Sequence, residues 1–369
     1  MKKHIFFIFL LWLTFSPTAV AENSAVIIMY HRFGENNFPS TNIKIEQFEQ
    51  HISKLKKDNY SVLPISKILS NIKKGLPLPS KTIGITIDDG YKSIYTEAWP
   101  RLKKAGFPFT VFISTDFIGK SRPNRLTWSE IKEMKNSGVD FGAHTASHAH
   151  MTQKTNAFNK GEITRSDQKM LEELGKKSEV FAYPFGEANS RIFDLVRQSG
   201  YKYAFGQHSG VVNAFSNNYF LPRFALNERY GDLDRFSVVI NALPLPVKDL
   251  TPSDPEIRNT NPPNIGFSIA KNLSNLDRLR CYTGSEGRVS TTLLGKNRIE
   301  VRMTKPFTSA RTRLNCTVKG PGNRWRWFGW MYVLNKISAQ QYQHLKYLCF
   351  NSKPRQYLIQ FFVSQSSLV

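Results

Sequence analysis

The feature that most constrains the fold is an alternation of short apolar runs with amphipathic segments between residues 25 and 245. Continuous apolar runs of this length are typical of strands buried on both faces, and apolar residues at i, i+4 and i+7 are typical of helices. Repeated strand–helix units predict parallel strands with right-handed crossovers, so the fold is expected to be a barrel or an open doubly wound sheet. The predicted strands are residues 25–30, 82–87, 109–113, 139–143, 180–183 and 201–205, and the predicted helices include 91–105, a helix opened by a capping box at 127–130, 165–177, 191–199 and 233–243.

Residues with polar or constrained side chains follow four of these predicted strands. Asp88 and Asp89 follow one strand, His144 a second, Pro184 a third and His208 a fourth. The carboxyl ends of parallel strands converge on one face, and in such folds that face holds the active site. The sequence therefore predicts a site built from these strand ends.

Two histidines and two aspartates in this set predict a metal site. His144 and His148 are four residues apart, and if the segment turns as a helix, both imidazoles can share one ion. Asp88 or Asp89 would complete two histidines and one aspartate, which leaves positions open for water and substrate. The other carboxylate could accept a proton from water whose pKa the metal has lowered, a pattern that suits hydrolysis of a carbonyl substrate. Taken alone, a histidine pair is often a solvated surface feature and an Asp-Asp pair a helix cap, so the prediction depends on finding them together.

Several short motifs resemble those of the polysaccharide deacetylases, the NodB-homology domain of carbohydrate esterase family 4. Residues 86–91 (TIDDGY) resemble the family's T-F-D-D-G-Y motif, and residues 144–148 (HTASH) resemble its H-[ST]-x-x-H motif. Residues 181–186 (FAYPFG) resemble its third motif, and residues 29–31 (MYH) an opening strand seen in many members. The resemblance extends over about residues 25–245 and implies a distorted (β/α) barrel.

The resemblance also implies a role for each motif residue. Asp89, His144 and His148 would bind a divalent metal ion, usually zinc, and Asp88 would be the general base. Water activated by the metal would attack the acetyl carbon of an N-acetylated sugar, releasing acetate and a free amino sugar. The backbone N–H of Phe185 would help to hold the oxyanion.

The third motif departs from the family pattern. Tyr183, Pro184 and Phe185 are expected to contact substrate or oxyanion, but Ala182 stands where the family has an arginine that orients the base. Arg223, in the next segment of the chain, is the candidate to replace that arginine, and it is also expected to contact substrate or oxyanion.

The family's late L-x-H motif, whose histidine is the general acid, has no match between residues 209 and 250. His208 is the nearest strand-end candidate for the acid, and the alternative is a hydrogen-bonded loop histidine. His31 is a weaker candidate, expected to be structural or to support the site, and His150 is expected to be solvated.

The first residues are typical of a secretory signal peptide. Two lysines are followed by an apolar run at residues 5–15 and an Ala-Val-Ala site at 19–21. The run is too short to span a bilayer comfortably, so cleavage is expected, with an uncleaved anchor as the alternative. No later segment is apolar enough to cross a membrane. The chain is expected to be exported to the periplasm or secreted, and in that oxidising setting Cys281 and Cys316 are expected to pair.

The remaining sequence predicts five segments. A signal peptide at 1–21 precedes a deacetylase domain at 22–245, and a stretch dense in proline at 246–264 is expected to be a linker. Short alternating runs predict a small all-β, sandwich-like domain at 265–334. Its strand aromatics, among them two tryptophans on one face, are expected either to close the core or to bind carbohydrate. Residues 335–369 form a tail to which no role is assigned.

The positive charge is concentrated towards the C-terminus. The whole chain has 51 Lys and Arg against 28 Asp and Glu, and residues 264–369 contain 17 of the former and 3 of the latter. This excess indicates either an ordinary basic protein or a C-terminal domain that sits on an anionic envelope surface or polymer. Nucleic acid is not an expected partner, because export takes the chain out of the cytoplasm.

Three functions are consistent with the sequence. The first is a metal-dependent N-deacetylase of a polysaccharide that contains N-acetylglucosamine. The second is a catalytically weak polysaccharide-binding protein that keeps the deacetylase fold, and the third is a metal-dependent hydrolase of another amide, such as a peptide. The pair Asp88–Asp89 with both histidines favours the first, because a binding protein needs no base beside a metal.

Overall fold

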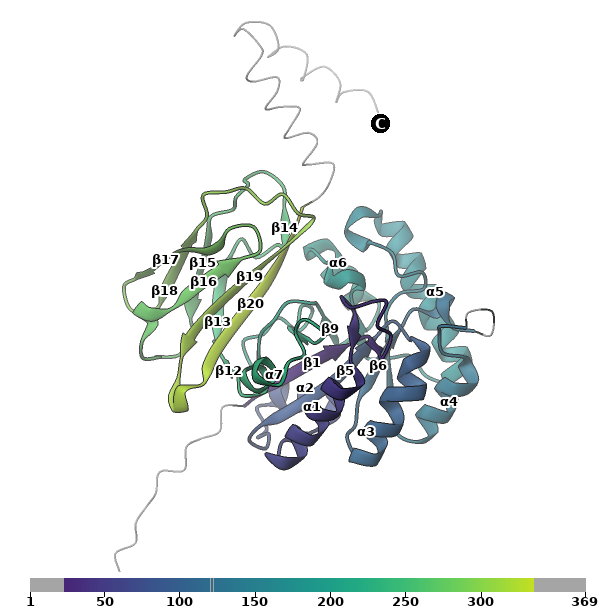
Figure 1. The fold of residues 1–369 in the computed structure, drawn as a ribbon. Helices are drawn as coiled ribbons and strands as arrows, with labels where there is room; N and C mark the ends of the chain where they lie inside the picture. Colours follow the sequence, from purple (N-terminus) through teal and green to yellow (C-terminus); the bar gives the residue numbers. More distant parts are fainter. Residues whose placement is uncertain (1–22, 120, 122, 335–369) are drawn as a thin grey trace, which may run out of the picture.

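The structure is a computed structural model that describes residues 23–119, 121 and 123–334 (Figure 1). The predicted signal peptide at 1–21 and the tail at 335–369 lie outside the described residues. Within them, no helix is both long enough and apolar enough to cross a membrane.

The first domain is a curled sheet covered by helices, as the predicted distorted barrel requires (Figure 1). Strands β1, β5, β6, β7, β8 and β9 run parallel in that order, and each confirms a predicted strand. All seven residues of β5 are buried, which explains why its sequence is apolar throughout rather than alternating. The strands of this sheet are β1 (Ser24–Tyr30), β4 (Ser61–Val62), β5 (Thr82–Asp88), β6 (Thr110–Ile113), β7 (Asp140–Ala143), β8 (Val180–Ala182), β9 (Tyr203–Phe205), β10 (Val212–Asn213) and β11 (Phe224–Ala225), and β2 (Arg32–Phe33) pairs separately with β3 (Asn42–Ile43).

The helices follow the predicted pattern with differences at their ends and in one interior. The predicted helix at 233–243 ends at Ile240, and Leu243 begins strand β12. The predicted helix at 91–105 contains a π-helical turn, Ile94–Ala98, directly before α3, where Pro100 lacks the N–H for a regular helical bond. Helix α5 starts before the predicted residue 165, because Thr155 caps it by accepting the N–H of Phe158. The helices are α1 (Ile45–Lys57), α2 (Ile65–Lys74), α3 (Trp99–Ala105), α4 (Trp128–Asn136), α5 (Asn156–Leu174), α6 (Ser190–Gln198) and α7 (Leu233–Ile240).

The second domain is a single sheet that curls back on itself. Phe267 of β15 contacts Phe328 of β20, with ring centroids 5.4 Å apart, although four strands lie between these two in the sheet. Opposite parts of the sheet therefore face each other across a shared core, which confirms the sandwich-like prediction. The strands, in sheet order, are β12 (Leu243–Pro244), β20 (Trp325–Leu334), β19 (Arg311–Lys319), β16 (Arg280–Thr283), β17 (Gly287–Leu294), β18 (Arg298–Arg302), β15 (Ile265–Ile269) and β13 (Val247–Thr251), with β14 (Glu256–Ile257) also paired to β20.

The predicted disulfide between Cys281 and Cys316 is present. The two cysteines are direct partners across β16 and β19, and both are fully buried. The bond therefore joins neighbouring strands inside the core of the second domain.

The prediction of a linker at residues 246–264 is wrong. Strand β13 pairs with β15, and β14 pairs with β20, so this stretch belongs to the second sheet. Val247 and Ile257 bury their side chains in the core. The prolines of this stretch lie between its strands rather than within them, so none of them removes a ladder hydrogen bond.

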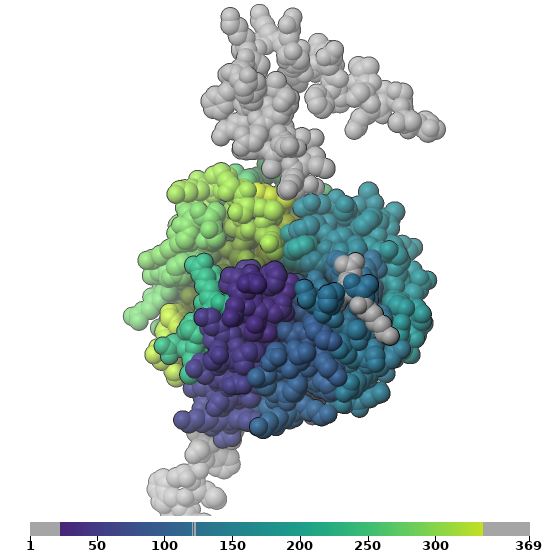
Figure 2. All heavy atoms as spheres, turned by 45° about the vertical axis from the view of Figure 1, so that its right-hand side comes forward, coloured from purple at the N-terminus to yellow at the C-terminus, as the bar shows by residue number. Residues whose placement is uncertain are grey.

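The two domains pack directly against each other through β20, as Figure 2 also shows. Gly329 of β20 lies so close to the first domain that a Cβ there would come within 1.8 Å of the Ser209 carbonyl oxygen. Trp327 packs edge-on against Phe224, with ring centroids 5.1 Å apart. These contacts place one face of the second domain beside the strand ends of the first.

Candidate metal centre

Three predicted ligands converge at the carboxyl ends of two parallel strands. Asp89 follows β5, and His144 and His148 follow β7. Asp89 Oδ1 lies 3.4 Å from His144 Nε2 and 3.2 Å from His148 Nε2. One ligand atom from each of the three residues lies within 4.8 Å of the other two, close enough to hold one ion.

The two histidines share this position for a reason other than the predicted one. Residues 144–148 do not turn as a helix, because Thr145 and His148 have positive φ angles of 63° and 57°. The turn is held by a hydrogen bond from the His148 N–H to Thr145 Oγ1 and by Glu162, which accepts from the N–H and hydroxyl of Ser147. The strained backbone indicates a position fixed by its surroundings, as is common at functional sites.

The donor set fits a divalent cation. Among the described residues, neither Asp89 Oδ1 nor His144 Nε2 has a hydrogen-bond partner, although both atoms are buried. Burial alone would raise the pKa of Asp89, but His144 and His148 hold that pKa well below its usual range, so the side chain stays a carboxylate. Buried polar atoms that face one another without hydrogen bonds are expected where an ion completes the site.

The histidines are held in the form that binds metal. His144 Nδ1 lies 2.6 Å from the Ala182 carbonyl oxygen, so that nitrogen donates and Nε2 presents its lone pair towards Asp89. Burial lowers the pKa of His148, and its neighbour His144 adds to that effect, while Asp89 opposes it. A lowered pKa keeps this imidazole neutral and able to act as a ligand.

Asp88 points to a different partner from its neighbour Asp89. Both of its oxygens accept hydrogen bonds from Arg223, at 2.7 and 2.8 Å, and both side chains are fully buried. Burial raises the pKa of Asp88, but Arg223, His144 and His31 outweigh it and lower the pKa. The structure thus places Arg223 where it fixes the orientation of the Asp88 carboxylate, although Ala182 stands at the position of the arginine in the family motif. Arg223 is too deeply buried to touch substrate, contrary to its prediction as a substrate contact.

The site opens into a cleft of about 780 Å³ that both domains line. His31 lies in this cleft with Nε2 4.0 Å from Asp88 Oδ2, so it is closer to the predicted base than the sequence suggested. The second domain contributes a wall that the sequence did not predict, because those residues are distant along the chain. The lining from the second domain is Arg311, Arg313, Asn315 and Trp327.

Of the third motif, only Phe185 reaches the cleft. Its backbone has a φ of 59°, and its ring packs edge-on against His148, with centroids 4.5 Å apart. Tyr183 is buried in the core and donates its hydroxyl to the Tyr219 carbonyl, and Pro184 is also buried. The prediction that Tyr183 and Pro184 contact substrate is therefore contradicted.

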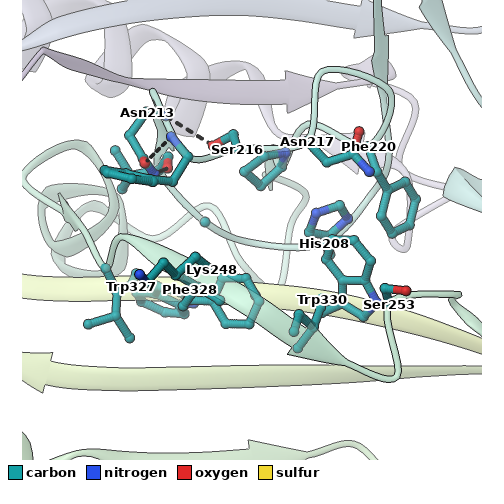
Figure 3. A pocket seen from close by; sticks show the side chains of 18 of the residues that line it. His208, Asn213, Ser216, Asn217, Phe220, Lys248, Ser253, Trp327, Phe328 and Trp330 are labelled. Carbon is teal, nitrogen blue, oxygen red and sulfur yellow. Dashed lines mark hydrogen bonds between the residues drawn. The ribbon is translucent and has the colours of Figure 1, made fainter. Parts of the chain in front are cut away.

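His208 lies outside the cleft, which contradicts its prediction as the general acid. Gln207 and Ser209 line the cleft, whereas His208 faces the opposite side and lines a separate cavity of about 350 Å³ between the domains. Figure 3 shows it there beside Phe220 and Trp330, with ring centroids at 4.4 and 5.9 Å. Burial lowers the pKa of His208 to about 3, so it is neutral and has no proton to give at neutral pH.

Comparison with known proteins agrees with this geometry. Residues 75–204 match the family model for polysaccharide deacetylases. The chain is 28% identical over 233 residues to the poly-β-1,6-N-acetyl-D-glucosamine N-deacetylase of Staphylococcus aureus strain MRSA252, covering 56% of this chain and 80% of that protein.

Two solved structures share the fold. The Streptococcus pyogenes deacetylase PplD in complex with acetate is 22% identical with a TM-score of 0.55, over 59% of this chain and 98% of that one. IcaB from Ammonifex degensii is 24% identical with a TM-score of 0.53, over 60% of this chain and 98% of that one. None of these three proteins covers more than 60% of this chain.

Proposed function

We propose that this chain, which contains a polysaccharide deacetylase domain, hydrolyses the N-acetyl groups of a polymer of N-acetylglucosamine with a divalent metal ion held by Asp89, His144 and His148. The observation that carries the proposal is the convergence of these three ligand atoms beside a carboxylate, Asp88, that Arg223 holds in one orientation. The Staphylococcus aureus relative is named for poly-β-1,6-N-acetyl-D-glucosamine, which supports a β-1,6-linked polymer as substrate.

The metal is proposed to be zinc, because two imidazoles and one carboxylate with open positions are a common catalytic zinc set. The ion would polarise the acetyl carbonyl and lower the pKa of water in the site. Every other part of the reaction falls to side chains and backbone of the chain itself.

The described residues divide that work. Asp88 would take the proton of the attacking water, since Arg223 keeps it charged and fixed. The Phe185 N–H would bind the oxygen that gains charge as the acetyl carbon becomes tetrahedral. His31 would protonate the leaving nitrogen, because it is the histidine near Asp88 that faces the cleft without being a proposed ligand. The C–N bond then breaks, and acetate and a free amine leave.

The site of action is proposed to lie outside the cytoplasm. The signal-like first residues support export, and the substrate named for the bacterial relative is a polysaccharide. The basic second domain would then hold the enzyme against an anionic envelope surface, through exposed cations such as Lys271, Arg288 and Lys296. Release of the protein from envelope fractions by about 0.5 M salt, where the Debye length is only a few ångströms, would be expected.

The function is tested by acetate release from oligomers of N-acetylglucosamine. Purified protein is stripped with a chelator, reloaded with zinc and offered β-1,6-linked oligomers, with β-1,4-linked chitin oligomers in parallel. We expect acetate from the β-1,6 oligomers with zinc and none after chelation. Failure of the zinc-loaded protein to release acetate from either polymer would contradict the proposal.

A further inference from the structure

We propose that Arg311, which belongs to the second domain, is a positioning residue of the active site: it holds Phe185 in the backbone conformation that oxyanion binding requires. The inference rests on the proposed deacetylase function, and it makes the second domain part of the catalytic unit rather than an appended module. Nothing in the local sequence around Phe185 indicates this dependence.

Arg311 is placed to act on Phe185 directly. It begins β19 and reaches across the domain boundary, where its guanidinium donates a hydrogen bond of 2.9 Å to the Phe185 carbonyl oxygen. The guanidinium carbon also lies 5.7 Å from the centroid of the Phe185 ring. Both residues line the cleft that contains Asp89 and His148.

Phe185 needs such a partner because its backbone is strained. A φ of 59° lies in the left-handed region, which is unfavourable for a residue other than glycine and persists only where the surroundings hold the backbone there. The carbonyl and the N–H of one residue are joined through its Cα, so anchoring the carbonyl restricts the direction of the N–H. That N–H is the group proposed to bind the oxyanion.

A second contact holds Arg311 in place. Its Nε lies 3.5 Å from Glu187 Oε1, and the other oxygen of Glu187 lies 2.8 Å from His150 Nδ1. The His150 ring stacks on the Phe185 ring, with centroids 3.7 Å apart and planes inclined by 2°. His150, expected from the sequence to be solvated, is instead half-buried in this closed circuit of four residues.

Substitution of Arg311 should affect the position of Phe185 without affecting metal binding or folding. Arg311 touches none of the three proposed ligands in the contacts described for it, and it lies at a partly exposed rim where water can replace it. Its loss should therefore leave metal and fold intact while releasing Phe185 from the strained conformation. Removing one oxyanion donor typically lowers kcat by about 10²–10³-fold. Here the N–H remains but is misdirected, so a fall of about 10–100-fold is expected.

The test compares Arg311→Ala and Arg311→Lys with wild type and with Arg278→Gln, a control that removes an exposed arginine from the 3-10 turn Leu276–Arg278 of the same domain. Kinetics on N-acetylglucosamine oligomers, zinc content and a crystal structure are measured for each protein. For Arg311→Ala we expect kcat to fall about 10–100-fold, KM to stay within about threefold, zinc to stay stoichiometric and Phe185 to adopt a negative φ. Arg311→Lys should recover part of kcat, since one ammonium donor can still reach the carbonyl.

The possible outcomes distinguish a failure of this inference from a failure of the proposed deacetylase function. A Phe185 that keeps its positive φ in the Arg311→Ala crystal structure would overturn the positioning role, whatever the kinetics show. A rise in KM with unchanged kcat would also overturn it, because Arg311 would then be a substrate contact. If wild type itself releases no acetate, the proposed function fails, and the conformation of Phe185 in the variant still decides what Arg311 does.

Discussion

The cleft beside Asp89 and the cavity between the domains lie on opposite sides of one short segment, residues 207–210. A histidine meets different surroundings in each of them. Gln207 and Ser209 face the cleft, while His208 and Gly210 face the cavity, and Trp327 of the second domain lines both. In the cleft, charged groups face each other with buried atoms left unpartnered. In the cavity, the aromatic side chains of Phe220, Trp327, Phe328 and Trp330 form part of the wall around His208, as Figure 3 shows.

The histidines of the two regions show what this difference means. His148 is half-buried, which lowers its pKa, but Asp89 lies 3.2 Å from its Nε2 and opposes that fall. His208 has no carboxylate among the causes of its shift, and the charges of Arg313 and Arg223 add to the effect of burial. Of these two histidines, His148 shares its surroundings with a carboxylate and His208 does not, and the following changes test what that difference does.

The largest effect is expected from Asp89→Asn. An amide keeps the shape of the side chain but removes the negative charge, and two histidines alone bind a divalent ion weakly. We expect loss of zinc by elemental analysis and loss of detectable acetate release. Asp194→Asn, which changes an exposed aspartate on α6, should keep both. Stoichiometric zinc in Asp89→Asn would remove this residue from the ligand set.

The adjacent change, Asp88→Asn, should separate activity from metal. Zinc should remain, while turnover should fall about 10²–10⁴-fold, the usual contribution of a general base. Because the variant leaves Arg223 buried without its charged partner, the free energy of unfolding should also fall, by about 3–5 kcal/mol. Denaturation followed by circular dichroism, with and without zinc, checks that the protein is folded under assay conditions. Near wild-type turnover would mean that the base lies elsewhere.

His31→Gln tests the replacement candidate for the general acid. It should lower kcat by about 10²-fold, the low end of general acid–base effects, and leave zinc binding unchanged. A kcat equal to that of wild type would return His31 to a structural role.

These comparisons also show which parts of the site could be predicted from sequence. The carboxyl ends of parallel strands converge on one face of the sheet. The four residues that could be predicted lie at or just after such ends: Asp88, Asp89, His144 and His148. Arg223 was a candidate because it lies in the next segment of the chain, directly before β11 of the same sheet. The direction in which each side chain of residues 207–210 points was not predictable, because this segment is irregular and has no strand periodicity. His208 turns away from the cleft there.

The contribution of the second domain was beyond prediction for a different reason. Alternation along β19 places Arg311 and Arg313 on one face, but no local pattern says which domain that face meets. The contact depends on the docking of β20 against the first domain, a tertiary arrangement between residues more than a hundred positions apart. The same limitation made residues 246–264 look like a linker, because their partners, β15 and β20, lie further along the chain.

The smallest effect on activity, and the clearest contrast with the cleft, is expected from His208→Leu. At neutral pH the variant should keep zinc and turnover within about twofold, because His208 is neutral there and faces away from the reaction. The difference between the two proteins should instead appear in their stability at acidic pH.

An unfolded histidine titrates at about 6.5, and the pKa of folded His208 is lowered to about 3, so between these values the unfolded state binds one more proton than the folded state. Wild type should therefore lose stability as the pH falls through this window, by about 1.4 kcal/mol per pH unit from this residue. The variant should show a correspondingly shallower slope. His51, whose pKa burial lowers to about 4, is retained in both proteins and cancels from the comparison. Urea denaturation at intervals from pH 7 to pH 4 measures the two slopes. Parallel slopes would show that His208 titrates alike in both states and that the cavity does not hold it neutral, and a large loss of turnover at pH 7 would restore it as a candidate acid.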